Sequence, residues 1–267
     1  MAGRRVIART LVVFAGLSSL WATSPSMAGT ANKDLCDDEW NGMQDLSPAD
    51  RVRHWASVGP KCGNSGLYEV RLARLNTIVG HYEDARRVVD TGLALHSPYE
   101  KELLSAGAEA DTGLRKLDSA LRTYMQLIAD YPDYYDGYGG VGSVKLLQHQ
   151  FTEAVKYLNE AAKRGKALYI FRNLVIAYHQ LGENQQAIDA MSTAYTVDKA
   201  IAKDVEAMNA AARSYVFMGK YHQADGTLKM LVQANPQAAN DPGIREAQLF
   251  VAKKLAEEKQ KGSAGTS

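Results

Sequence analysis

The sequence lacks an excess of either charge, a long apolar run and the motifs of common enzyme families. Its 31 Lys and Arg residues nearly balance its 30 Asp and Glu residues, so we expect no basic surface for nucleic acid or anionic membranes. It has no Gly-rich phosphate loop, Gly-x-Ser-x-Gly elbow or His-Glu-x-x-His helix, and its six histidines are scattered. We therefore predict no catalytic residue, no metal site and no cofactor, and a protein that is not an enzyme.

The first 28 residues have the pattern of a secretory signal peptide rather than of a membrane anchor. A positive start precedes a mostly apolar stretch over residues 11–22, and small residues, Ser26 and Ala28, precede the expected cleavage site after Ala28. This stretch is shorter than the roughly 20 apolar residues that a spanning helix needs. We expect export, by a Sec or twin-arginine route, to the periplasm or the medium, with no membrane insertion afterwards. Cleavage would remove three arginines and change the formal charge from +1 to −2.

Cysteine is scarce, and both residues follow the expected cleavage site. An even number of cysteines in an exported chain favours a disulfide between Cys36 and Cys62. Two free buried thiols, or half of a metal site, are the alternatives.

What the sequence does contain is an internal repeat. The segment GHYEDA at 80–85 returns as GKYHQA at 219–224, and the alanine that ends it recurs at intervals of 35, 34, 33 and 37 residues. Apolar residues around each alanine follow helical spacing. A second helical pattern precedes each one and, in the clearest copies, ends at a glycine such as Gly182 or Gly219. Each unit of about 34 residues is therefore predicted to be a helix, a tight turn and a helix.

The units resemble the tetratricopeptide repeat family. The best copies are FRNLVIAYHQLGENQQAIDAMSTAY at 171–195 and MNAAARSYVFMGKYHQADGTLKMLVQANP at 208–236, with the small, aromatic, glycine, alanine and proline positions of that family. The second copy departs from the pattern at Asp111 and Arg115, and the third at Lys145, Gln148 and His149. The resemblance implies an all-α, right-handed α-solenoid of about five helix hairpins whose inner face binds a protein or peptide.

The expected organisation follows from these repeats. Residues 29–65 form an N-terminal cap with the disulfide, residues 239–258 a C-terminal capping helix that Asp241 begins, and residues 259–267 a disordered tail. Trp40 and Trp55 cover the first repeat, or alternatively form an exposed docking site. The repeats themselves cover residues 66–238, as the units 66–99, 101–134, 135–168, 168–201 and 205–238.

The candidate partner-binding groove runs along the side of each first helix that packing leaves free. Its C-terminal half is basic and amide-rich, so an acidic or C-terminal carboxylate group is expected to pair with Arg172 or Arg213. The oligomeric state is left open. The groove candidates are Arg74, Glu109, Arg172, Asn173, His179, Asn209 and Arg213.

The segment YPDYYDGYGGVG at 131–142 supports a rival function. Its tyrosines, Tyr131, Tyr134, Tyr135 and Tyr138, are interpreted mainly as packing between the second and third units, with Gly139, Gly140 and Gly142 allowing close approach. The alternative is an aromatic platform for a glycan, which would make the protein a cell-wall-binding accessory subunit. The leading hypothesis remains a non-catalytic scaffold or adaptor that binds a protein or peptide segment in the cell envelope and helps to assemble an envelope complex.

Overall fold

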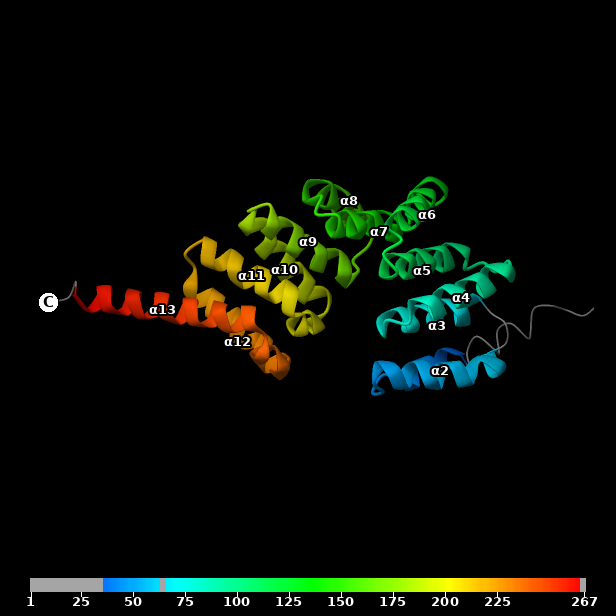
Figure 1. The fold of residues 1–267 in the computed structure, drawn as a ribbon, viewed down its shortest axis with the longest axis horizontal. Helices are drawn as coiled ribbons and strands as arrows, with labels where there is room; N and C mark the ends of the chain where they lie inside the picture. Colours follow the sequence, from blue (N-terminus) through cyan, green and yellow to red (C-terminus); the bar gives the residue numbers. More distant parts are fainter. Residues whose placement is uncertain (1–35, 63–65, 265–267) are drawn as a thin grey trace, which may run out of the picture.

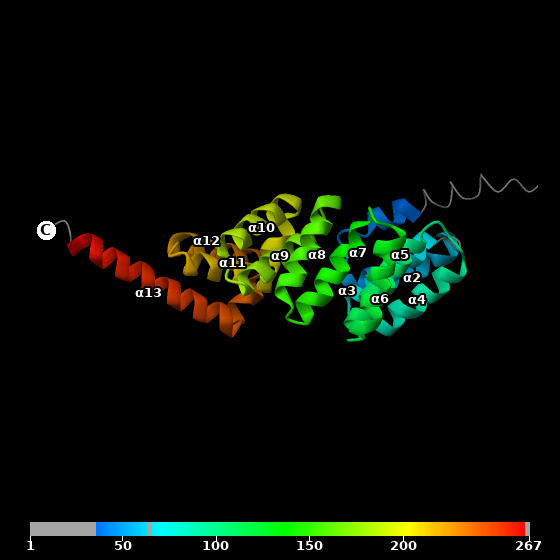
Figure 2. The ribbon, with the colours of Figure 1, turned by 90° about the horizontal axis from the view of Figure 1, so that it is seen from above.

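The computed structural model describes residues 36–62 and 66–264, and the expected signal peptide lies outside these ranges. The described chain is a series of helices that pack in consecutive pairs, and Figure 1 shows them following an arch from α2 to α13. Seen from above in Figure 2, neighbouring hairpins stand side by side along the long axis. None of the described helices is both long and apolar enough to cross a bilayer.

Five hairpins form the described array, and their bounds follow the predicted units within a few residues. The pairs are α3 (Gly66–Ile78) with α4 (Tyr82–Ala94), α5 (Glu100–Gly113) with α6 (Leu117–Asp130), α7 (Tyr135–Leu147) with α8 (Phe151–Arg164), α9 (Leu168–Gln180) with α10 (Asn184–Val197), and α11 (Val205–Phe217) with α12 (Tyr221–Ala234). Short 3₁₀ helices follow the last two pairs, η1 (Lys199–Lys203) and η2 (Pro236–Asn240).

The repeated alanines lie in the core of the array. Ala85, Ala120, Ala154, Ala187 and Ala224 are all completely buried, with 0% of each residue exposed. Each lies in the first turn of a second helix, where a larger side chain would separate the two helices of a hairpin. The repeat of about 34 residues seen in the sequence therefore corresponds to a repeat of buried positions in the structure.

All five hairpin turns use a left-handed residue two positions after the first helix ends. Gly80, Gly182 and Gly219 hold this position with φ between 70° and 83°, as expected for glycine. The second and third hairpins place Arg115 (φ 61°) and His149 (φ 59°) there instead. A residue with a Cβ is disfavoured by about 1 kcal/mol in this conformation, so these two turns keep the repeat geometry at a cost in stability.

The N-terminal cap contains the predicted disulfide and buries its aromatic core. Residues 36–42 are helical, α2 covers Pro48–Cys62, and the Cys36–Cys62 bond has an S–S distance of 2.05 Å. Trp55 is fully buried, contacts Trp40 edge to face at 5.2 Å and donates from Nε1 to the carbonyl of Tyr68 on α3. Because Trp55 is inaccessible, these residues cover the end of the array, as the cap interpretation predicts.

Arg71 on α3 also holds the N-terminal cap against the first repeat. Its guanidinium lies 4.9 Å from the ring centroid of Trp40, pairs with Asp37 and donates to the carbonyl of Cys36 at 3.1 Å. The first repeat and the cap are therefore held together by stacking, charge and hydrogen bonding as well as by apolar burial.

The C-terminal helix α13 spans Pro242–Ala264 and begins as predicted, with the Asp241 carboxylate accepting from the backbone N–H of Ile244. Ile244 and Val251 are buried against the last repeat. The structure differs from the sequence prediction at the other end, because the helix continues beyond residue 258. The ion pair of Lys254 and Glu257, at helical spacing, supports the turn that precedes these additional residues.

Candidate functional site

Three cavities lie along the first helices of the hairpins and share lining residues, so they form one continuous groove. Their volumes are about 640, 490 and 570 Å³, from the N-terminal to the C-terminal end. The first two cavities share Arg115, Ser143 and Asn173, and the last two share Gln180 and Glu206. We call the three together the groove, and the first of them the chamber.

The groove contains most of the residues predicted for it. Glu109 lines the chamber, and Arg172 and Asn173 line both the chamber and the second cavity. The third cavity is lined by His179, Asn209 and Arg213. Arg74 is not among the lining residues, because it pairs with Asp136 at 3.1 Å on the chamber wall.

Arg172 was expected to meet an acidic partner, but its guanidinium is already bound within the chain. Nε donates to Asp204 at 2.7 Å, Nη2 to Glu206 at 2.7 Å and Nη1 to the side-chain oxygen of Asn173 at 3.0 Å. The two carboxylates raise the pKa of Arg172 against the effect of its burial. This arginine therefore joins the fourth and fifth hairpins, and a ligand would have to compete with two carboxylates for it.

Arg213 and Arg115 are the groove arginines that have no ion pair with any described residue. Arg213 lies on α11 in the third cavity, and Arg115 lies in the turn after α5, between the chamber and the second cavity. Both are exposed. The sequence prediction did not include Arg115 in the groove. The only signal in the sequence was that an arginine stands where the repeat pattern has its turn glycine.

The third cavity also has amide groups that lack partners. The side-chain oxygens of Asn184 and Asn209 are buried and accept no hydrogen bond from a described residue. Nearby, His179 Nδ1 lies 3.0 Å from Ser214 Oγ, and burial followed by the charge of Arg213 lowers the pKa of His179. The third cavity thus offers hydrogen-bond acceptors beside a cation and a neutral imidazole at neutral pH.

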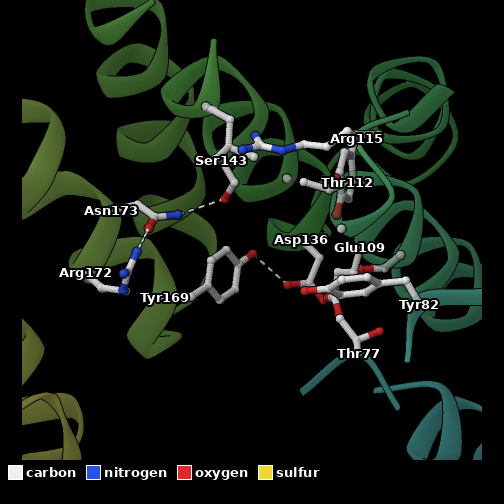
Figure 3. Close-up of a pocket in the computed structure, with 15 residues that line it drawn as sticks. Thr77, Tyr82, Glu109, Thr112, Arg115, Asp136, Ser143, Tyr169, Arg172 and Asn173 are labelled. Carbon is white, nitrogen blue, oxygen red and sulfur yellow. Dashed lines mark hydrogen bonds between the residues drawn. The ribbon is translucent and has the colours of Figure 1, made fainter. Parts of the chain in front are cut away.

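The chamber has a different character, because acids and tyrosines form its walls. Asp136 accepts hydrogen bonds from the hydroxyls of Tyr134 and Tyr169, at 2.7 and 2.8 Å, as well as from Arg74. Figure 3 shows Tyr169 pointing toward Asp136 across the chamber, with Glu109 beyond it. Burial, the largest cause, and the Asp136 charge raise the pKa of Tyr169 well above its ordinary value.

Burial also raises the pKa of Glu109 to about 7, while the charge of Arg74 opposes the increase. Glu109 has no hydrogen bond or ion pair among the described residues, in contrast to Asp136. The two carboxyl groups of the chamber therefore differ: Asp136 is fully engaged by the protein, whereas Glu109 ionises near neutral pH and faces the cavity.

The four tyrosines of the alternative platform are half-buried at the junction of the second and third hairpins. The Arg164 guanidinium lies 4.0 Å from the ring centroid of Tyr138, and Lys101 lies 5.3 Å from that of Tyr134. Tyr135 packs on Gly165, and the ring of Tyr131 lies in the same apolar cluster as Tyr134. These contacts agree with the packing interpretation, and the glycan platform stays a prediction.

The comparisons with known proteins agree with the repeat architecture. Residues 206–238, the fifth hairpin, match the family model described as tetratricopeptide repeat. No curated protein matches the sequence.

Solved structures resemble the chain along most of its length at low identity. A thermophilic TPR protein from Thermus thermophilus matches with a TM-score of 0.54 and 20% identity, over 72% of this chain and 100% of that one. The Cut9-Hcn1 hetero-tetramer of the APC/C matches with 0.64 and 16%, over 83% and 45%. Yeast Tom70 matches with 0.61 and 10%, over 85% and 47%, so this chain spans less than half the length of these last two. The described chain is an all-α solenoid with the fold of tetratricopeptide repeat proteins, and its fifth hairpin carries the repeat's sequence pattern.

Proposed function

We propose that the protein is a non-catalytic, exported scaffold whose groove binds an extended, acidic segment of another protein in the cell envelope. The observation that carries this proposal is the continuous groove, along which Arg115 and Arg213 have no ion pair with any described residue. Solenoid repeats characteristically use such concave surfaces for binding. A groove that crosses several hairpins fits a linear segment better than a compact small molecule.

Charge and hydrogen bonding favour an acidic peptide over other linear ligands. The two free guanidinium groups match carboxylates, and planar guanidinium–carboxylate pairs are among the stronger polar contacts in proteins. The buried side-chain oxygens of Asn184 and Asn209 need donors, which peptide N–H groups would supply. The rest of the chain is nearly neutral, so the attraction is local to the groove.

Two features support export. The first 28 residues have the pattern of a signal peptide, and the Cys36–Cys62 bond is of the kind that persists in oxidising compartments. We therefore propose that the protein acts in the periplasm or outside the cell, in the assembly of an envelope complex. Fractionation with N-terminal sequencing is expected to find a mature chain that begins near residue 29 and whose cysteines resist alkylation; a cytosolic chain with free thiols would contradict export.

The binding proposal is tested by selecting peptides from a random displayed library on the mature protein. The wild-type chain is expected to enrich peptides rich in Asp and Glu, and the double variant Arg115→Glu/Arg213→Glu to lose this enrichment. The control, Arg122→Glu/Lys253→Glu, makes the same change of charge at exposed positions outside the groove. The absence of acidic enrichment on the wild-type chain, or equal enrichment on the groove variant, would refute the proposal.

A further inference from the structure

The chamber is large enough to hold a ligand group and is built from several hairpins. Its volume of about 640 Å³ lies within the usual range of ligand sites and is many times the roughly 30 Å³ occupied by one water molecule. Its walls include Tyr82 at the start of α4, Tyr124 on α6 and Tyr169 on α9. Its acids, Glu109 and Asp136, come from α5 and α7.

Four hydroxyl donors of the walls and their surroundings are already used. Tyr169 donates to Asp136, as does the neighbouring Tyr134, while Thr77 and Thr112 donate to the carbonyls one turn earlier on their own helices, at 3.1 and 2.8 Å. These groups keep lone pairs toward the chamber but offer it no further hydrogen.

Two side chains on α5 have no hydrogen-bond partner among the described residues. Glu109 has no hydrogen bond or ion pair with a described residue, and Ser105, one turn earlier on the same face of the helix, is fully buried with its Oγ atom unpartnered. A buried oxygen without a hydrogen bond is costly, and a carboxylate without a donor is more so. The charge of Arg74 acts on Glu109 without a hydrogen bond between the two, so the carboxylate and the Ser105 oxygen are both open to a ligand with several N–H donors.

A primary ammonium group meets this requirement, because it has three N–H donors, no acceptor and a positive charge. Tyrosine rings add favourable contacts with a cation and with the alkyl chain that carries it. The one unpaired guanidinium of the chamber among the described residues belongs to Arg115, and Figure 3 shows that side chain extending toward Ser143, away from Glu109 and Asp136. Since Arg74 and Asp136 form an ion pair, the remaining charges of the chamber are the Glu109 carboxylate on its α5 side and Arg115 on the side that opens into the second cavity.

We propose that the chamber binds a lysine side chain of the segment that occupies the groove, with the ammonium on Glu109 and Ser105. This proposal rests on the proposed function and adds a basic anchor to an otherwise acidic segment. The segment would place its lysine at the N-terminal end of the groove and its acids toward Arg115 and Arg213.

The probes are Nα-acetyl-lysine N-methylamide and its Nε-acetylated counterpart, which has the same chain without the charge. Binding is followed by nuclear magnetic resonance titration of the mature protein and of two isosteric variants, Glu109→Gln and Glu83→Gln. Glu83 is exposed in the first turn of α4 and serves as the matched control. We expect the lysine probe to bind the wild type and the control equally, and the Glu109→Gln chain at least about tenfold more weakly.

A pH series adds a readout that a purely structural role of Glu109 would not produce. Because burial raises the pKa of Glu109 to about 7, affinity for the lysine probe is expected to rise from pH 6 to pH 8 in the wild type and to stay flat in Glu109→Gln. The groups that face Glu109 are Arg74, Asp136 and the tyrosines, whereas Arg115 extends away from it. Burial raises the pKa values of Tyr124 and Tyr169 well above this range, so these two hydroxyls stay neutral.

Three results would overturn the proposal: no binding of the lysine probe to the wild type, equal binding of the two probes, or equal affinity of the folded Glu109→Gln chain. Each is independent of the peptide selection, which depends on Arg115 and Arg213. If the chain selects acidic peptides but does not bind the lysine probe, the proposed peptide-binding function of the groove stands and the proposed lysine site in the chamber is refuted.

Discussion

Replacing Glu109 by glutamine is expected to stabilise the protein above neutral pH and to leave its stability unchanged in mild acid. Burial raises the pKa of this carboxyl from 4.5 to about 7 in the folded chain. The folded state therefore binds more protons than the unfolded state between these values, and its stability falls as pH rises through that window. At about 1.4 kcal/mol for each tenfold change in ionisation, the full loss is about 3 kcal/mol.

Solvent in the chamber screens the carboxylate, so we expect the variant to gain about 1–3 kcal/mol over the wild type at pH 8. At pH 4, below both pKa values, the carboxyl is mostly neutral in the folded and the unfolded chain, and the two stabilities should agree within about 0.5 kcal/mol. Urea titrations of both chains at pH 4 and pH 8, followed by circular dichroism, measure this difference, and the comparison of the two chains removes the contribution of all other titrating groups. A variant less stable than the wild type at pH 8, or an equal difference at both pH values, would refute the reasoning.

Three further predictions concern the fold. Replacing Cys36 by serine opens a loop with a sequence separation of 26 and should cost about 3.5 kcal/mol in the chain-entropy model, measured against the oxidised wild type in urea. Gly140→Ala places a Cβ 2.2 Å from the buried Tyr124 ring and should lower stability by about 1–3 kcal/mol, whereas Gly226→Ala, with open space around it, should raise stability by about 0.5–1 kcal/mol; equal effects would contradict the packing account. Arg115→Gly should raise the melting temperature, because glycine adopts the left-handed conformation without the cost of about 1 kcal/mol that a residue with a Cβ carries. The same change should weaken the binding of acidic peptides. An unchanged melting temperature would show that the turn is unstrained.

The sequence predicted the architecture well because a repeat reports the same physical requirement several times. The recurring alanines mark positions where two helices touch, and all five are completely buried. Turn glycines marked where the backbone needs positive φ, and the structure keeps that conformation even where Arg115 and His149 replace them. Where one repeat departs from the pattern, the positions of its helices still follow from the spacing of the other repeats.

The groove was located from the same periodicity, but its chemistry was not. Helical phase shows which face Arg172 occupies, yet its partners Asp204 and Glu206 come from the next hairpin, more than 30 residues away. Likewise, Asp136 was interpreted only as part of a tyrosine-rich junction, because its contact with Arg74 joins residues 62 positions apart. Ion pairs between hairpins depend on side-chain reach across the array, which periodicity does not encode.

The extent of the last helix escaped prediction for a local reason. The residues beyond the expected boundary, KQKGSA at 259–264, are mostly polar, and the turn before them carries the ion pair of Lys254 and Glu257. Apolar periodicity, on which the expected boundary at residue 258 depended, carries no signal for a helix that is polar on every side.

The central claim, that the groove binds a partner, is tested most directly by photocrosslinking in intact cells that make the protein. Gln180 lies in the groove and Gln186 lies on the outer helix of the same hairpin, and both are exposed, so a photoreactive residue at either position gives a matched pair. We predict a discrete protein adduct at position 180, mapping to an acidic segment of the partner, that is lost in the Arg115→Glu/Arg213→Glu background. An adduct at position 186 alone, or one at position 180 that survives both charge reversals, would contradict it.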